Sequence, residues 1–169
     1  PWRILAVTFT NKAAGEMRAL AAPLLGEERA RKLWIGTFHS TAARLLRMYG
    51  ECLGLRRDFQ IYDDDDQKKL AARVMTDLGI SDRVLTVRAL LSRIDKAKNE
   101  GLTVSEFAPD DYLEELVARA WPEYQRRLRA ANAVDFGDLL VEALRLTSDP
   151  DCAPELLARF GMADGLVSP

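Results

Sequence analysis

The sequence has few of the residues that metal centres and disulfide-braced folds require. It contains two cysteines, Cys52 and Cys152, and one histidine, His39. The cysteines lie far apart and outside any CxxC pattern, so neither a metal cage nor a disulfide framework is predicted. We interpret both as incidental small hydrophobic residues of a protein in a reducing cytoplasm. A single histidine also excludes a metal site or a mechanism that needs two.

Long apolar runs and a strong charge imbalance are missing as well. No run approaches the roughly 20 apolar residues of a membrane-spanning helix, so no membrane partner is predicted. The 24 Lys and Arg residues against 26 Asp and Glu exclude a strongly basic DNA coat, although local nucleic-acid contacts remain possible. The length of 169 residues fits one domain, or one domain with an inserted subdomain. The chain does not begin with Met, which suggests a piece of a longer protein.

The sequence also lacks the motifs of a nucleotide-hydrolysing site. It has no GxxxxGK[ST] loop, and no acidic pair follows a strand as a Mg²⁺ site of this kind would require. The acidic run at residues 63–66 lacks the alternating spacing and the glycine of a calcium loop. We interpret it as the capped start of a helix, where carboxylates complement the helix dipole. No catalytic constellation is therefore predicted.

Two strand-to-helix turns occupy the first fifty residues. Residues 4–9 are apolar on both faces, which predicts a buried strand of a parallel sheet. Thr10 or Asn11 can cap the helix that follows, and Gly26 can end it. A second apolar run at residues 33–35 leads through GTFHS into another helix. Because open α/β sheets bind ligands at the carboxyl ends of their strands, these turns predict a binding rim.

Helical patterns dominate from about residue 53 to residue 131. The expected helices start after residue 63 and at Thr86, and a longer one runs from Asp110 with Pro122 inside it, which means a kink or two abutting helices. Two more follow, in VDFGDLLVEALRL and at residues 153–160. The simplest architecture is an α/β layer interrupted by a helical insertion, with the chain returning to the layer near Asp135.

The residues of the two turns allow two interpretations. Thr8, Thr10 and Asn11 beside a helix start can bind phosphate oxygens, and Phe9 offers a face on which a base can stack. Alternatively, the polar residues are ordinary caps and Phe9 belongs to the core. At the second turn Thr37, His39 and Ser40 can bind phosphate, or the histidine is structural. Several basic residues form either a duplex-facing surface or merely solvated helix faces: Arg44, Arg47, Arg56, Arg57, Lys96, Lys98, Arg126, Arg127 and Arg129.

Five segments resemble one family of motor proteins, in order and over residues 2–160. ILAVTFTNKAAGEM resembles motif Ia of superfamily 1A DNA helicases, the UvrD/PcrA/Rep group, and IGTFHSTAARLLR resembles motif Ib. The stretches FQIYDDDDQ, AKNEGLTVSEF and YQRRLRAANAVDFGDLL are similar to the segments between motif Ib and the Walker B region. TFTNKAA and TFHS at this spacing are highly specific. Position 137 departs from the family, with Gly where many relatives carry Asp, and so does GMADGLVSP after Phe160.

The resemblance implies an α/β fold, a partial RecA-like P-loop NTPase domain with an inserted helical subdomain. Residues 1–52 would begin domain 1A, residues 53–131 would form subdomain 1B over the duplex, and residues 132–169 would return to domain 1A before the Walker B region. The parent would be an ATP-dependent 3′→5′ DNA helicase of repair or replication that binds single-stranded and duplex DNA. ATP and Mg²⁺ would be its cofactors, although their binding motifs are absent from this chain.

The resemblance also implies which residues contact DNA. Phe9 would be the stacking group, and the second turn would add phosphate and base contacts. The full set is Thr8, Phe9, Thr10, Asn11, Lys12, Thr37, Phe38, His39, Asp135, Phe136 and Asp138. We expect the fragment alone to be inactive as an enzyme. Two alternatives remain: a catalytically inactive helicase-derived DNA-binding or interaction module, and a relative of helicase–nuclease subunits.

Overall fold

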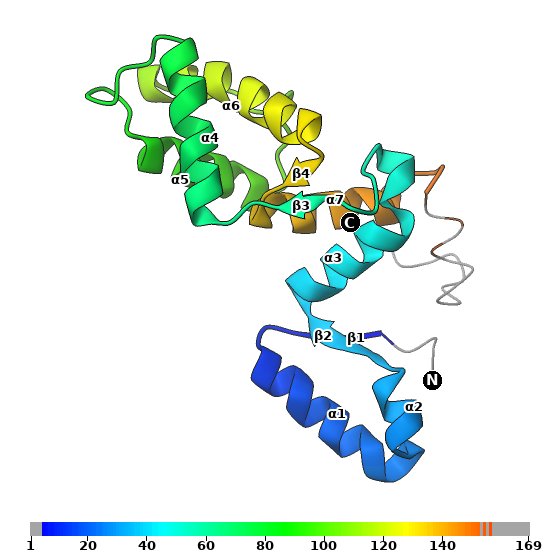
Figure 1. Ribbon diagram of the computed structural model, residues 1–169. Coiled ribbons are helices and arrows are strands. Elements are labelled where there is room, and N and C mark those ends of the chain that lie inside the picture. The colour runs from blue at the N-terminus through cyan, green and yellow to red at the C-terminus, as the bar shows by residue number, and fades with distance from the viewer. Residues whose placement is uncertain (1–4, 153, 155, 157–169) are drawn as a thin grey trace. The chain divides into compact units, whose positions relative to one another are not determined.

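The protein divides into two compact units. Its structure, a computed structural model, describes residues 5–152, 154 and 156 (Figure 1). Unit 1 comprises Pro1–Arg57 and Glu142–Pro169, and unit 2 comprises Asp58–Val141. The sequence placed the boundaries after residues 52 and 131, about five and ten residues earlier. The helix expected at residues 153–160 lies mainly outside the described residues. The departure from the family pattern after Phe160 lies wholly outside them.

Unit 1 contains a two-stranded parallel sheet with both predicted strand-to-helix turns. Its elements are β1 (Leu5–Thr8), α1 (Asn11–Leu25), α2 (Glu27–Arg31), β2 (Trp34–Thr37), α3 (Phe38–Tyr49) and the 3₁₀ turn η1 (Gly50–Leu53). The strands pair in parallel, from Leu5 opposite Trp34 to Thr8 opposite Thr37. Helix α1 lies beside this sheet (Figure 1). The two strands and the helices that follow them are therefore confirmed, whereas the short α2 was not predicted. The expected burial of the first strand is not observed, because Val7 is exposed and the other residues of β1 are only half-buried.

The helices of unit 1 begin and end where local chemistry dictates. Thr10 caps α1, because its hydroxyl oxygen accepts a hydrogen bond from the Ala13 amide at 3.1 Å. Gly26 ends α1 with a φ of +82°, a conformation in which a side chain would be strained. Thr37 caps α3 and accepts from the Ser40 amide at 3.2 Å. The structure thus selects Thr10, rather than Asn11, as the first cap.

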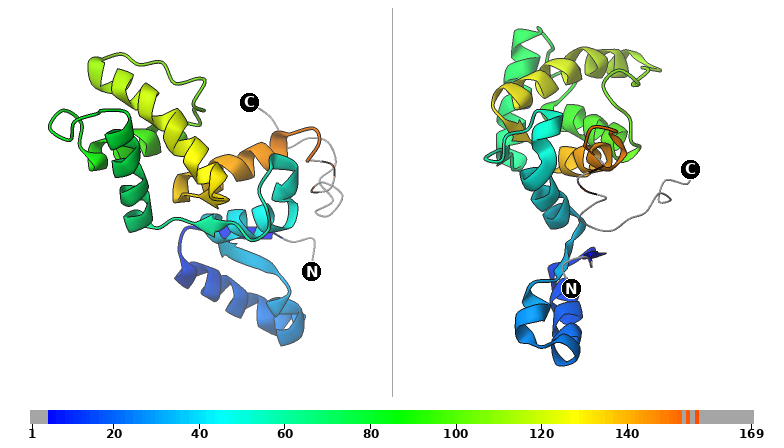
Figure 2. Two further views of the ribbon diagram at one scale, coloured as in Figure 1. Left: turned by 45° about the horizontal axis from the view of Figure 1, so that its top comes forward. Right: turned by 90° about the vertical axis from the view of Figure 1, so that its right-hand side faces the viewer.

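Unit 2 is a helical layer with a small parallel sheet. Its elements are β3 (Gln60–Ile61), α4 (Asp64–Asp77), α5 (Val87–Asn99), α6 (Tyr112–Ala130), β4 (Ala133–Val134) and the start of α7 (Phe136–Ser148). Helices α4, α5 and α6 contact one another pairwise around a buried core (Figure 2). Pro122 lies inside a single helix, α6, so two abutting helices are excluded. The pairing of Gln60 with Ala133 was not predicted.

The acidic run is a helix cap, as the sequence indicated. The Asp63 carboxylate accepts hydrogen bonds from the amides of Asp65 and Asp66, each at 2.9 Å. The Asp66 amide is the main cause of a lowered pKa of Asp63. Among the residues that the structure describes, no group of three His, Cys, Asp or Glu side chains could hold a metal ion. In the same part of the chain, no helix is long and apolar enough to cross a membrane.

The interpretation of the cysteines as incidental hydrophobic residues is wrong. Cys52 in η1 and Cys152 after α7 form a disulfide, with their Cα atoms 5.9 Å apart and a sequence separation of 100. Both belong to unit 1, which is assembled from two separate chain segments. Sequence spacing alone cannot reveal this pair, because the fold brings together residues on either side of the insertion.

Candidate nucleic-acid interface

Two phenylalanines stand at the carboxyl ends of the paired strands of unit 1. Phe9 follows β1, and Phe38 follows β2 as the first residue of α3. Their side chains are 88% and 40% exposed, and the ring centroids lie 5.2 Å apart with the rings tilted by 47°. The interpretation of Phe9 as a core residue is therefore excluded. Exposure of two adjacent aromatic rings is unfavourable in water, and such exposed apolar patches are typical of interaction surfaces.

The starts of two helices meet at the same edge of the sheet. Because Thr8 lies opposite Thr37 in the β1–β2 register, α1 and α3 both begin there. Each start leaves amide groups without helical partners and carries the positive end of a helix dipole, which favours anions such as phosphate. We call the following eight residues the aromatic rim: Thr8, Phe9, Thr10, Asn11, Lys12, Thr37, Phe38 and His39.

Side chains in the aromatic rim remain accessible. Phe9, Asn11, Lys12 and His39 are all exposed. The Lys12 ammonium lies 4.0 Å from Glu16 in an exposed pair, which is worth little and leaves the ammonium free to turn toward another anion. Aromatic faces beside phosphate-binding groups are the two components that single-stranded nucleic acid requires, because its bases are unpaired and can stack.

Basic groups of unit 1 fix the strand that carries Thr37. The Arg18 guanidinium on α1 donates to the Ile35 carbonyl oxygen at 2.6 Å. The Arg44 guanidinium lies 3.9 Å from the centre of the buried Trp34 ring, a cation–π contact. Arg44 was predicted either for a duplex-facing surface or for a solvated one; it is exposed, and its contact with Trp34 also holds α3 against β2.

The two aspartates predicted to contact DNA are buried in unit 2. Asp135 and Asp138 are 1% and 2% exposed, and Lys98 on α5 is 5% exposed. The Lys98 ammonium lies 2.6 Å from Asp135 Oδ2 and 2.8 Å from Asp138 Oδ1. The placement of Lys98 on a surface was therefore wrong. We call these three residues the Lys98 cluster. Its two carboxylates are buried and paired with Lys98, so they are not accessible to a nucleic acid. Phe136, by contrast, is about half exposed.

Hydrogen bonds from three elements complete the Lys98 cluster. Asp135 Oδ1 accepts from the Asp138 amide at 2.8 Å, and Asp138 Oδ2 accepts from the Asp135 amide at 3.3 Å, which forms a reciprocal cap at the start of α7. The Tyr124 hydroxyl donates to Asp135 Oδ2 at 3.2 Å. The Gln125 amide nitrogen donates to both oxygens of Asp138. The DFGDL segment is therefore a buried junction of α5, α6 and α7.

The Lys98 cluster contains one ammonium and two carboxylates, and this imbalance shifts the pKa values of Lys98 and Asp135. Burial would lower the pKa of Lys98, but the two carboxylates outweigh it and raise that pKa. Burial and the adjacent Asp138 raise the pKa of Asp135 more than Lys98 lowers it. Burial also raises the pKa of Tyr124, so its hydroxyl stays protonated and can donate. One ammonium thus stabilises two carboxylates without neutralising both.

Gly137 lies against the aliphatic part of Lys98. A Cβ atom at this position would lie 3.0 Å from Lys98 Cδ, which is closer than ordinary contact. The glycine lets the first turn of α7 approach the aliphatic part of Lys98. The sequence did contain a signal for this burial, because Lys98 stands four residues after the buried Ile94 on the inner face of α5.

Other basic residues of unit 2 are engaged with acidic neighbours. Arg126 and Arg127 both bind Glu123, at 2.7 Å and 2.6 Å, and Arg127 also binds Asp77 at 2.7 Å. Hydrogen bonds from Arg126 and then Arg127 lower the pKa of Glu123 to about 2. Arg126 and Arg127 thus form an ion-pair network on the outside of α6, which supports the solvated interpretation of these two residues.

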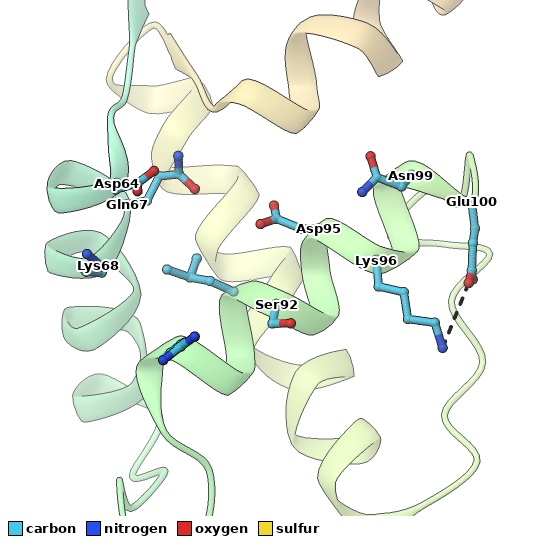
Figure 3. Close-up of a pocket in the computed structure, with 10 residues that line it drawn as sticks. Asp64, Gln67, Lys68, Ser92, Asp95, Lys96, Asn99 and Glu100 are labelled. Carbon is cyan, nitrogen blue, oxygen red and sulfur yellow. Dashed lines mark ion pairs between the residues drawn. The ribbon is translucent and has the colours of Figure 1, made fainter.

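A hollow of about 740 Å³ lies between α4 and α5 of unit 2 (Figure 3). Among the side chains around it, Gln67 and Asp95 face the space between the helices, and Lys96 pairs with Glu100 (Figure 3). Loss of hydration is the main cause of a raised pKa of Asp95. Three basic and three acidic residues line the hollow: Lys68, Arg88, Lys96, Asp64, Asp95 and Glu100.

Comparison with known proteins identifies the family of this chain. The model of the UvrD/REP helicase N-terminal domain matches residues 1–163. The chain belongs to the UvrD/REP helicase family. Its aromatic rim and its DFGDL junction thus lie in the N-terminal domain of that family, as the resemblance of motifs Ia and Ib predicted.

Curated relatives match most of the chain. The ATP-dependent DNA helicase PcrA of Leuconostoc citreum is 43% identical over 162 residues, and the ATP-dependent DNA helicase UvrD1 of Mycobacterium bovis is 44% identical over 169 residues. The PcrA helicase of Bacillus subtilis is 35% identical over 159 residues. These alignments cover 95%, 94% and 93% of this chain, respectively, but only 21% of each relative. The chain therefore spans about a fifth of the length of the relatives.

Proposed function

We propose that the chain is the part of an ATP-dependent DNA helicase that binds the single strand along which the motor moves. The exposed Phe9–Phe38 pair at an edge where two helices begin is the observation that carries this proposal. The names of the relatives support the parent activity. Unit 1 would belong to the RecA-like domain 1A and unit 2 to subdomain 1B, which would lie over the duplex. The parent would work in the cytoplasm with 3′→5′ polarity.

Each part of the aromatic rim has a distinct proposed role. Phe9 and Phe38 stack on successive bases, since every base has an aromatic face and stacking tolerates any sequence. Thr8, Thr10 and Thr37 with the amides at the two helix starts bind the phosphates between those bases. Asn11, Lys12 and His39 add polar and electrostatic contacts. Asp135 and Asp138 have no direct DNA contact in this proposal, because their carboxylates serve the Lys98 cluster.

ATP and Mg²⁺ would act elsewhere in the parent protein. The sequence holds no GxxxxGK[ST] loop, and the described residues hold no group of three acidic, histidine or cysteine side chains that fits a metal ion. We therefore assign none of the described residues to the nucleotide or its cation. In this proposal the chain contributes the DNA contacts, and the phosphate chemistry belongs to the remaining length of the parent.

Replacing Phe9 with alanine tests the proposal. Loss of one stacked base is worth about 1–3 kcal/mol, so we expect the affinity for a labelled oligothymidylate to fall by about 5- to 150-fold. Fluorescence anisotropy at one fixed salt concentration measures this, because phosphate contacts depend steeply on salt. Leu24→Ala is the matched control: this side chain is 84% exposed, on the last turns of α1 away from the aromatic rim.

The control separates stacking from a general loss of apolar surface. We expect Leu24→Ala to leave the affinity unchanged within about twofold, since it removes a comparable exposed group without a base contact. Equal affinities of Phe9→Ala and the wild type, in a chain that is folded and binds the oligonucleotide, would refute the stacking role.

A further inference from the structure

We propose that the Cys52–Cys152 pair is a reversible thiol–disulfide site that opens by attack on Cys52. The two cysteine residues differ sharply in exposure. Cys52 lies in η1 and is exposed, whereas Cys152 is 3% exposed. Thiol–disulfide exchange requires an incoming thiolate to reach one sulfur, so the exposed member of the pair determines where the reaction starts.

The surroundings of Cys52 suit a small polar reductant. A hollow of about 220 Å³ lies against both cysteines, and its walls include Met48, Glu51, Arg57 and Asp151. The Arg57 guanidinium lies 3.2 Å from Glu51 across an exposed surface. A dithiol of the dithiothreitol or dihydrolipoyl class can therefore reach the sulfur from solvent, without prior unfolding of unit 1.

The structure also provides a partner for the reduced state. The carbonyl oxygen of Tyr49 lies 3.0 Å from Cys52 Sγ. A Cys52 thiol can donate its hydrogen to that oxygen, so reduction exchanges the disulfide for a hydrogen bond at the end of α3. Cys152, as a buried thiol, behaves as a small apolar residue.

A dithiol is the only reductant that the thiol–disulfide exchange needs, because it supplies both electrons. One thiolate of the dithiol attacks Cys52 Sγ, the Cys52–Cys152 bond breaks, and Cys152 leaves as a thiolate that takes up a proton. The second thiol of the reductant, as thiolate, then attacks the mixed disulfide, which releases Cys52 as a thiolate that is protonated in turn. The products are two cysteine thiols and the cyclic disulfide of the reductant, and the reverse reaction restores the bond.

The disulfide joins two segments of unit 1, so its reduction is expected to change the stability of that unit. Unit 1 is built from chain segments on both sides of unit 2, and the disulfide joins those segments. It closes a loop of 100 residues that contains unit 2. Reduction of the disulfide raises the conformational entropy of the unfolded chain. Because this favours unfolding, reduction is expected to lower the thermal midpoint of unit 1.

Two single-cysteine variants test which sulfur is accessible. In Cys152→Ser the remaining Cys52 thiol is expected to react with an aromatic disulfide reagent at least about tenfold faster than the Cys152 thiol does in Cys52→Ser. Both variants are measured in the folded chain, with circular dichroism as the check on folding. Equal rates, or a faster Cys152, would overturn attack at Cys52.

The wild-type chain tests the reversible bond itself. Native dithiothreitol treatment is expected to release two thiols without denaturant and to lower the thermal midpoint by about 5 °C or more. Oxidised dithiothreitol is expected to restore the midpoint, and Cys52→Ser is expected to show no response to either reagent. Two free thiols before treatment, or thiols released only in denaturant, would overturn the proposal.

Discussion

Lys98→Met is expected to lower the free energy of unfolding of unit 2 by about 3–5 kcal/mol, the usual cost of leaving a buried charge without its partner. Lys98 is the one ammonium within 3 Å of both Asp135 and Asp138 among the described residues, at 2.6 Å and 2.8 Å. Methionine keeps the length and the apolar stem of the side chain, so packing against Tyr124 and α7 is largely preserved. The loss of stability therefore reports on the removal of the ammonium charge rather than on lost packing.

Lys96→Met on the same helix is the matched control. Its ammonium is exposed and lies 3.9 Å from Glu100, so its removal is expected to change stability by no more than about 0.5 kcal/mol. Urea unfolding followed by Trp121 fluorescence reports on unit 2 when Trp2 and Trp34 of unit 1 are replaced by phenylalanine in both proteins, because the Trp121 side chain is buried in the core of unit 2. Equal stability of the two variants would contradict the account of the Lys98 cluster.

The pH dependence of Lys98→Met gives a second readout. Without the ammonium, the folded-state pKa of Asp135 rises further, so the folded variant binds more protons than the unfolded one. Its stability therefore increases as the pH falls, and the deficit against wild type is expected to be smaller at about pH 5 than at about pH 8. A deficit of the same size at both values would show that lost packing, rather than unpaired charge, is responsible.

Asp135→Ala is expected to destabilise unit 2 by about 2–4 kcal/mol while leaving the oligonucleotide affinity of the folded chain unchanged. Its carboxylate caps α7, accepts from Tyr124 and pairs with Lys98. The same urea experiment measures the first effect, and anisotropy at a temperature where both proteins are folded measures the second.

Asp135→Asn is the matched variant for this prediction. Its amide oxygen can still cap α7, so we expect a smaller loss of stability than with alanine. The account would fail if Asp135→Ala weakened DNA binding in the folded chain with stability unchanged. That outcome would return Asp135 to the set of direct DNA contacts that the family resemblance implied.

Local patterns made the strands and turns of unit 1 predictable. A short apolar run that ends in Thr–Phe–Thr–Asn fixes both the strand and the cap at Thr10, since these depend on neighbouring residues only. The same holds for Thr37 and α3. The exposure of Phe9 was left open, because an apolar residue at a strand end suits both a core and a binding surface.

Long-range pairings could not be predicted from one sequence. Lys98 meets Asp135 across 37 residues, and Cys52 meets Cys152 across 100. Such pairs depend on how α5 and α7, or the two segments of unit 1, come together, which local propensity does not encode. The helical spacing from Ile94 indicates that Lys98 lies on the inner face of α5, but neither this spacing nor a cysteine without a CxxC motif identifies the distant partner.

Photochemical cross-linking tests the central claim most directly. An oligothymidylate that carries 5-bromouracil is bound to the chain, irradiated, and the attached peptides are identified by mass spectrometry. If the aromatic rim holds the single strand, the cross-links fall on Phe9, Phe38 or His39, and Phe9→Ala reduces them at its own position. Cross-links confined to residues 58–141, with none in the aromatic rim, would contradict the account.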